Sequence, residues 1–222
     1  MSEVMVTVHG EHVARVAPEE AVATLVVRAE GAARERVVHD VSAWTAPLRD
    51  ELATAEAEGR VAQWSSDGMS VWAERPWNAE GKRLAPVFHA AVTVTATFTD
   101  FDALSAWASE VIAREGVQFS GLEWRLSPLT KAALERSVAA EAVTVAVERA
   151  TAYARALGLS AVSAVEIADA GMLSDDRGGR GESARPLMAR AAFSGDADGA
   201  DIRLQPADVV VSATVDARFI AR

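Results

Sequence analysis

Hydrophobic and polar residues alternate with a period of two in four stretches of the chain, and this alternation predicts half-buried β-strands. Valine occupies every second position over residues 4–8, and this first strand is predicted to end at Gly10. The same alternation covers residues 23–29. Residues 88–98 place Phe, Ala and Val on one face and mainly Thr on the other, and residues 209–219 close the chain in the same way.

Three other segments repeat their apolar residues every three or four positions, which predicts amphipathic helices. They cover residues 32–59, 100–116 and 127–158. Pro47 lies inside the first segment and is expected to kink that helix, because proline has no N–H to donate. The third segment opens with Ser127 followed by proline, a typical helix start, and its roughly thirty residues correspond to about 45 Å of helix.

Three shorter segments complete the pattern. Residues 60–75 form a strand region that the Asp67-Gly68 pair interrupts with a turn or a bulge. Residues 117–126 alternate with a change of parity near Gly121, which predicts a β-bulge. Residues 162–167 read as one more short strand.

The order of these elements predicts an α+β fold. From the second strand to the fifth, the order β-α-β-β-α-β is that of a split βαβ (ferredoxin-like) unit. We therefore expect a mostly antiparallel sheet and three main helices, including one long helix in the C-terminal half. No linker divides the chain, so residues 1–222 are expected to form one domain. Residues 171–205 hold six of the 14 glycines and are predicted to be a flexible Gly/Asp-rich surface loop.

The amino-acid composition argues against several classes of function. The formal net charge of −10 argues against nucleic-acid binding through the phosphate backbone. The chain has no cysteine, which excludes disulfides, thiolate zinc sites and a cysteine nucleophile. Lysine occurs only at Lys82 and Lys131 and alanine is frequent, a bias typical of a bacterial genome rich in G and C.

The N-terminal residues give an expectation for where in the cell the protein is located. Glu3 stands where a signal peptide has basic residues, and no apolar core of sufficient length follows. We therefore expect a cytoplasmic protein. No apolar run is long enough to cross a bilayer, so direct membrane insertion is not expected.

Two clusters could hold a metal ion. His9, Glu11 and His12 lie at the predicted turn after the first strand and could offer two imidazoles and a carboxylate, although their spacing is not that of a helical HExxH site. The alternative is an ordinary solvated turn. A second cluster, Asp196 with two further aspartates around Gly199, could offer oxygens to calcium but lacks the EF-hand register. These aspartates are Asp196, Asp198 and Asp201.

No motif indicates catalysis or a cofactor. The chain has no Gly-x-Ser-x-Gly elbow, and its four histidines show no spacing that pairs them with a serine nucleophile. With 32 acidic residues, carboxylate pairs are frequent by chance and identify no general acid and base. The protein is therefore predicted not to be an enzyme and to bind no cofactor.

A group of tryptophans is the best candidate for an interaction surface. Trp64, Trp72 and Trp77 lie close in sequence, beside Arg75 and Lys82. Aromatic side chains with a polar atom are enriched at binding surfaces, so a peptide, a glycan or a second subunit could bind here. The alternative is burial in the core or in a hairpin.

Several motifs, taken in order, resemble the SIMPL domain family, also called DUF541. The first is a Val-x-Val-x-Gly strand that ends at Gly10, with Pro18 before the next strand. The second is the Phe88-His89-Ala90 segment before a valine-rich strand. The third is the block over residues 116–127, which precedes a long Ala-rich helix that ends at Gly158. The likeness covers nearly the whole chain, with a terminal alternating strand as its last element.

The resemblance implies an α+β subunit that assembles into homo-oligomers, ring-like or channel-like in some relatives. It also implies links to the cell envelope, stress tolerance or signalling, with no established reaction or cofactor. Two features depart from the family pattern. Many bacterial relatives look exported, whereas this chain shows no signal segment, and His12 replaces the second glycine of the usual Gly-x-Gly.

The sequence thus supports a non-enzymatic, self-associating protein that acts through its oligomeric surface. Its protein partner beyond a second copy is unknown. The alternative from another class is a small-molecule binding module with a pocket between sheet and helices, lined by Trp72, Trp107 and Trp124. A hydrolase that uses the His9–His12 turn is a third possibility.

Overall fold

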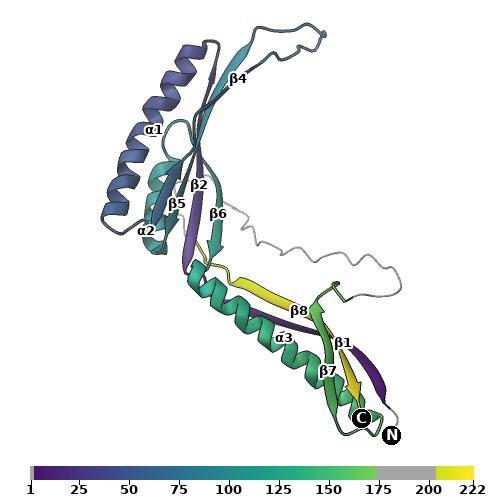
Figure 1. Cartoon of the computed structure of the whole chain (residues 1–222). Coiled ribbons are helices and arrows are strands. Elements are labelled where there is room, and N and C mark those ends of the chain that lie inside the picture. Colours follow the sequence, from purple (N-terminus) through teal and green to yellow (C-terminus); the bar gives the residue numbers. More distant parts are fainter. Residues whose placement is uncertain (1–2, 174–203) are drawn as a thin grey trace. The chain divides into compact units, whose positions relative to one another are not determined.

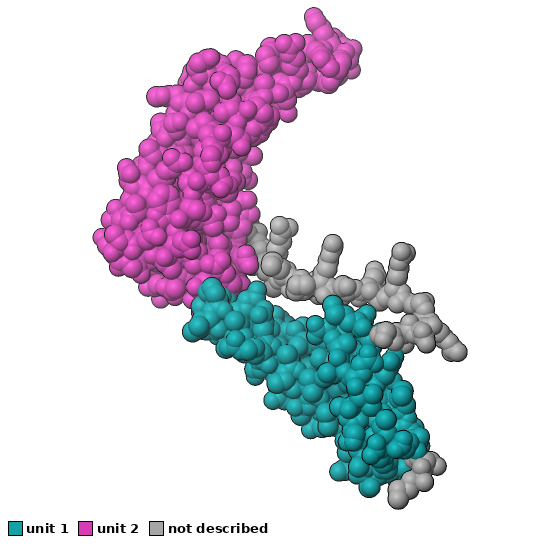
Figure 2. Space-filling view, viewed as in Figure 1, with its two compact units in different colours: residues 1–17, 126–188, 208–222 teal, residues 18–125, 189–207 magenta. Residues whose placement is uncertain are grey.

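The computed structural model describes residues 3–173 and 204–222, and the chain divides into two compact units (Figure 2). Unit 1 comprises residues 1–17, 126–188 and 208–222, and unit 2 comprises residues 18–125 and 189–207. Each unit has its own sheet and its own core of buried residues, with one described helix in unit 1 and two in unit 2. The α+β class is therefore confirmed, while the single domain over residues 1–222 stays a prediction.

Unit 2 has the strand order of a split βαβ fold. Its elements are β2 (Glu20–Gly31), α1 (Arg34–Ala57), β3 (Gln63–Ser66), β4 (Ser70–Glu74), β5 (Val87–Phe98), α2 (Phe101–Ile112) and β6 (Val117–Arg125). The sheet order is β3-β5-β2-β6, β4 also pairs with β5, and every pair is antiparallel. The predicted ferredoxin-like portion is confirmed.

Both helices of unit 2 cover the same face of its sheet (Figure 1). The register pairs Leu25 with Val94 and places both on this face, where they are fully or almost fully buried. Val41, Leu48 and Leu52 of α1 are fully buried against them. The period-two strands and the period-3.6 helix therefore meet along their apolar faces, as the sequence predicted.

Two local predictions in unit 2 concern Pro47 and Gly121. Pro47 lies inside α1, which continues without interruption from Arg34 to Ala57, so the proline does not end the helix. The register between β2 and β6 shifts between Thr24, which pairs with Gly121, and the next residue. The predicted bulge near Gly121 is confirmed.

The structure explains why glycine is needed at position 116, the first residue of the block that resembles the family. Its φ is 72°, in the left-handed region that favours glycine. A Cβ there would lie 2.2 Å from the ring of Trp44 and 3.0 Å from the carbonyl oxygen of Arg28. The glycine therefore lets the turn after α2 return the chain closely against α1 and β2.

Unit 1 is a three-stranded antiparallel sheet with one long helix. Its elements are β1 (Val4–Val16), α3 (Pro128–Ala156), β7 (Val162–Asp169) and β8 (Val209–Ala221), and the strand order is β1-β8-β7. The predicted N-cap of α3 is confirmed, because the Ser127 side chain accepts a hydrogen bond from the N–H of Thr130. The predicted end of the first strand at Gly10 is wrong. β8 supplies a partner for every residue of β1 from Val4 to Val16, so the strand continues through the glycine.

Gly10 is required by the close approach of α3 to β1. The helix presents alanines four residues apart, Ala142, Ala146, Ala150 and Ala154, and all of them are buried. A Cβ at position 10 would lie 2.2 Å from the carbonyl oxygen of Ala142 and 2.9 Å from the Cβ of Ala146. Strand and helix are therefore nearer to each other here than any side chain on the strand would permit.

Replacing Gly10 by alanine is expected to destabilise unit 1 by about 1–3 kcal/mol, because the added methyl group meets helix backbone that has to shift. Urea unfolding followed by circular dichroism measures this difference. The matched control is Gly121→Ala, since Gly121 also lies in a strand and a Cβ there meets no atom within 4 Å. Equal losses for both variants would contradict the close-contact explanation.

Candidate assembly surfaces

The face of the unit 2 sheet opposite α1 and α2 is called here the open face of unit 2. Within the described part of the chain, no helix packs on it (Figure 1). It carries the predicted Thr-rich face of β5 and the matching residues of β2: Thr24, Val26, Arg28, Glu30, His89, Ala91, Thr93, Thr95 and Thr97. A flat surface of β-branched hydroxyl residues suits either water or a second protein surface.

One end of this open face is covered by a single arginine. The Arg125 guanidinium donates from Nε to Oε2 of Glu20 at 2.8 Å and from Nη2 to Oγ1 of Thr97 at 3.4 Å. Thr97 and its cross-strand neighbour Val22 are both buried at this end of the sheet. The exposed part of the open face therefore begins beyond this arginine.

At the other end, an indole stacks on an imidazole. Trp72 of β4 pairs with His89 of β5, and their ring centroids are 5.2 Å apart with an angle of 13° between the planes. His89 Nδ1 is 3.6 Å from Oε2 of Glu30, and its Nε2 is 3.4 Å from Oε1 of Glu74. The His89 side chain is only 15% exposed, whereas Trp72 is 48% exposed. In this Trp72–His89 stack the indole is therefore partly exposed, and two carboxylates lie beside the imidazole.

The three tryptophans of the predicted interaction surface do not share one surface. Trp64 pairs with Ala96 on the helix side and packs against the core. Trp72 lies on the open face, because the pairing with β5 shifts by one residue between β3 and β4. Trp77 follows β4 and is 61% exposed. Two of the three indoles are therefore available to a partner.

The pocket suggested by Trp72, Trp107 and Trp124 is not assembled from these residues. Trp124 pairs with Ala21 on the helix side of the sheet and is 8% exposed, while Trp72 is on the opposite face. Trp107 of α2 packs on Phe98, with ring centroids 5.1 Å apart. The two inner indoles belong to the core of unit 2.

In unit 1, the cluster His9, Glu11 and His12 lies within β1 and not at a turn. Successive residues of a strand point to opposite faces, so His9 and Glu11 share one face and His12 lies on the other. The three side chains therefore do not converge. Among the residues that the structure describes, no group of three or more His, Asp or Glu side chains is placed to hold a metal ion. The aspartate cluster Asp196, Asp198 and Asp201 lies outside the described residues, as does most of the predicted loop over residues 171–205.

His9 instead contacts a residue from the other end of the chain. Its Nδ1 is 2.7 Å from Oδ1 of Asp216, its cross-strand neighbour, and the N–H of Gly171 donates to Oδ2 of Asp216 at 3.0 Å. The Gly171 bond first, and the His9 bond second, hold the pKa of Asp216 below its ordinary value of 3.8. Sequence reasoning missed this contact because 207 positions separate the two partners.

Asp216 is expected to make the free energy of unfolding fall as the pH is lowered into the acid range. A depressed carboxyl pKa adds stability that is present above 3.8 and is lost as the pH falls through the folded-state value. The wild type should therefore be more stable than Asp216→Asn at pH 6, and the gap should close towards pH 2. Urea unfolding at a series of pH values measures the gap. A constant difference across the series would contradict this assignment.

The face of the unit 1 sheet opposite α3 is called here the open face of unit 1. It carries the predicted polar residues of 210–218, and Arg218 donates from Nη1 to Oε2 of Glu166 at 2.9 Å. Apolar side chains are also exposed there: Met5 is 63% exposed, Val13 43% and Val210 46%. Because the order is β1-β8-β7, the outer edge of β1 has no strand partner in the described structure.

These features define an α+β protein with two sheet-and-helix units, each with one sheet face that no helix covers in the described structure. The chain belongs to the SIMPL family, whose description is a protein of unknown function (DUF541), and the family's model matches residues 6–219. The match confirms the resemblance seen in the motifs. A search of curated proteins found no match. No helix in the described ranges is both long and apolar enough to cross a membrane.

Proposed function

We propose that the protein is a non-enzymatic, self-associating subunit that acts through its assembled surface. The observation that carries this proposal is the one-sided coverage of both sheets, whose open faces are long and combine β-branched or apolar residues with polar ones. The outer edge of β1 adds backbone N–H and C=O groups, which need water or another strand.

Exposed apolar side chains on the open face of unit 1 add a driving force for association. Met5, Val13 and Val210 would each leave water in a subunit contact, at roughly 25 cal/mol per Å² of apolar area. A stable contact buries about 800 Å² on each partner.

The finer parts of the proposal are a cytoplasmic location, no binding of nucleic acid, and a role in stress tolerance, the envelope or signalling. The net charge of −10 supports the second part, because a polyanion would be repelled. The family membership supports the third part only as an implication of the resemblance.

Light scattering over a wide concentration range is expected to give a mass above that of one chain. A monomer at every concentration would overturn the proposal. Val13→Lys on the open face of unit 1 and Thr95→Lys on the open face of unit 2 are each expected to weaken association at least about tenfold, because a buried ammonium group is costly.

The matched control is Ala46→Lys on the exposed side of α1, which adds the same charge away from both open faces. It should leave the mass unchanged. Circular dichroism checks that all three variants fold. Equal masses for the control and the two face variants would exclude these faces as contacts.

A further inference from the structure

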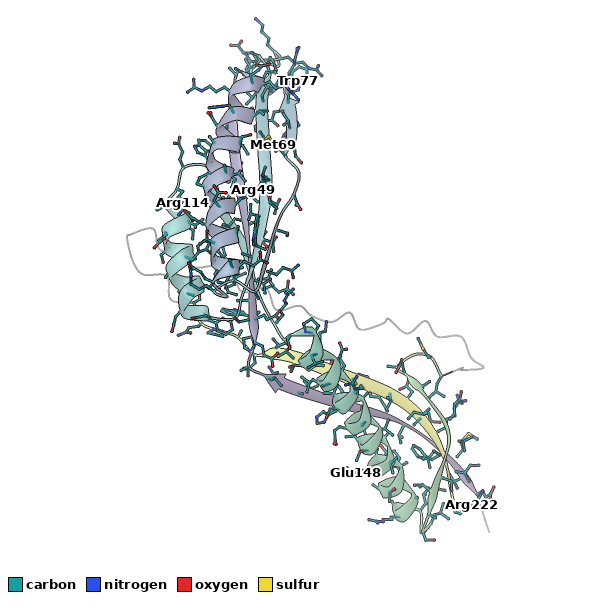
Figure 3. All side chains as sticks on the ribbon, turned by 60° about the vertical axis from the view of Figure 1, so that its left-hand side comes forward. Arg49, Met69, Trp77, Arg114, Glu148 and Arg222 are labelled. Atoms are coloured by element: carbon teal, nitrogen blue, oxygen red, sulfur yellow. The ribbon has the colours of Figure 1, made fainter. Side chains whose placement is uncertain are left out.

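Between β4 and β5 the chain forms a hairpin arm, defined here as residues 75–86. Trp77 and Arg83 form a bridge across the arm, and the N–H of Leu84 donates to the carbonyl of Pro76 at 2.9 Å. The turn at its tip is held by the Asn78 side chain, whose Oδ1 accepts from the N–H groups of Glu80 and Lys82. In Figure 1 the arm projects beyond β4 without a helix over it, and Figure 3 labels Trp77 there.

The arm is basic and aromatic in an acidic protein. It carries Arg75, Lys82 and Arg83 against one acidic residue, Glu80, whereas the whole chain has a net charge of −10. Trp77 is 61% exposed, and the guanidinium carbon of Arg83 lies 4.8 Å from its ring centroid. The tip therefore presents a cation held on an aromatic ring, an arrangement that favours a second aromatic or carboxylate partner.

At the base of the arm, where it joins β4 and β5, two exposed side chains are acidic. There the Trp72–His89 stack is flanked by Glu30 and Glu74, whose side chains are 77% and 63% exposed. Trp77 is five positions after Trp72, or roughly 17 Å along an extended chain. The cross-arm bonds hold the two sides of the arm together, and the tip lies beyond β4, away from this base (Figure 1).

We propose that two copies of the chain associate through their arms in an antiparallel, twofold-symmetric contact. The tip of each copy, with Trp77, Lys82 and Arg83, lies on the base of the other, where Trp72 is exposed and Glu30 and Glu74 flank the His89 ring on which it stacks. A twofold contact requires a self-complementary surface, and this ribbon provides one, because Lys82 and Arg83 lie at the tip while Glu30 and Glu74 lie at the base. The inference rests on the proposed self-association and names one of its contacts.

Reversing the charges at either end tests the contact. Lys82→Glu/Arg83→Glu places acid on acid in the homodimer, and Glu30→Lys/Glu74→Lys places base on base. Each double variant alone is expected to raise the dissociation constant at least about tenfold. In an equimolar mixture of the two, both contacts are again complementary, so the mixture should associate at least as well as the wild type at low salt.

The matched control is Lys131→Glu/Arg136→Glu, which changes the net charge as much as the tip variant but lies at exposed positions of α3 in unit 1. Sedimentation velocity gives the masses, and thermal unfolding checks the fold of each variant. If the wild type assembles but neither arm variant changes its mass, the arm contact is wrong while self-association stands. If each double variant weakens association but mixing the two does not restore it, the arm contact is also wrong. A wild type that stays monomeric overturns the proposed function itself.

Discussion

Coverage of each sheet by helices on one side only is the constraint on which the rest of the structure depends. Helix packing buries Leu25 and Val94 in unit 2 and Val8 and Phe219 in unit 1, and these residues supply the two cores. The opposite faces receive no such cover in the described structure. Their residues have to remain compatible with water and with a partner, which explains the mixture of threonine, charge and isolated apolar side chains.

Periodicity allowed much of this architecture to be predicted from the sequence. The burial of a strand residue depends on which face it occupies, and strict alternation over residues 88–98 and 209–219 identifies the face without knowledge of the neighbouring strands. The helix cap at Ser127 is equally local, since the capping oxygen and the N–H group from which it accepts a hydrogen bond lie within three residues of each other. Signals of this kind involve only neighbouring residues, so they can be recognised in a single sequence.

The features that the sequence did not predict correctly all depend on contacts with distant parts of the chain. Gly10 looked like a turn, but it is a strand residue whose missing side chain makes room for α3. Trp64 and Trp72 looked equivalent, but a one-residue shift of register places them on opposite faces. The contact between His9 and Asp216 joins the two ends of the chain. Nothing in the local pattern of one strand reports on which segment lies beside it.

The pairing of β1 with β8 has a consequence for synthesis on the ribosome. Every strand of unit 2 lies between residues 20 and 125, so its sheet can close while later residues are still being added. Val4–Val16 is made before unit 2, yet its partner begins only at Val209. While the intervening residues are being synthesised, the nascent polypeptide therefore carries an unpaired, valine-rich segment that is open to mispairing and chaperone capture.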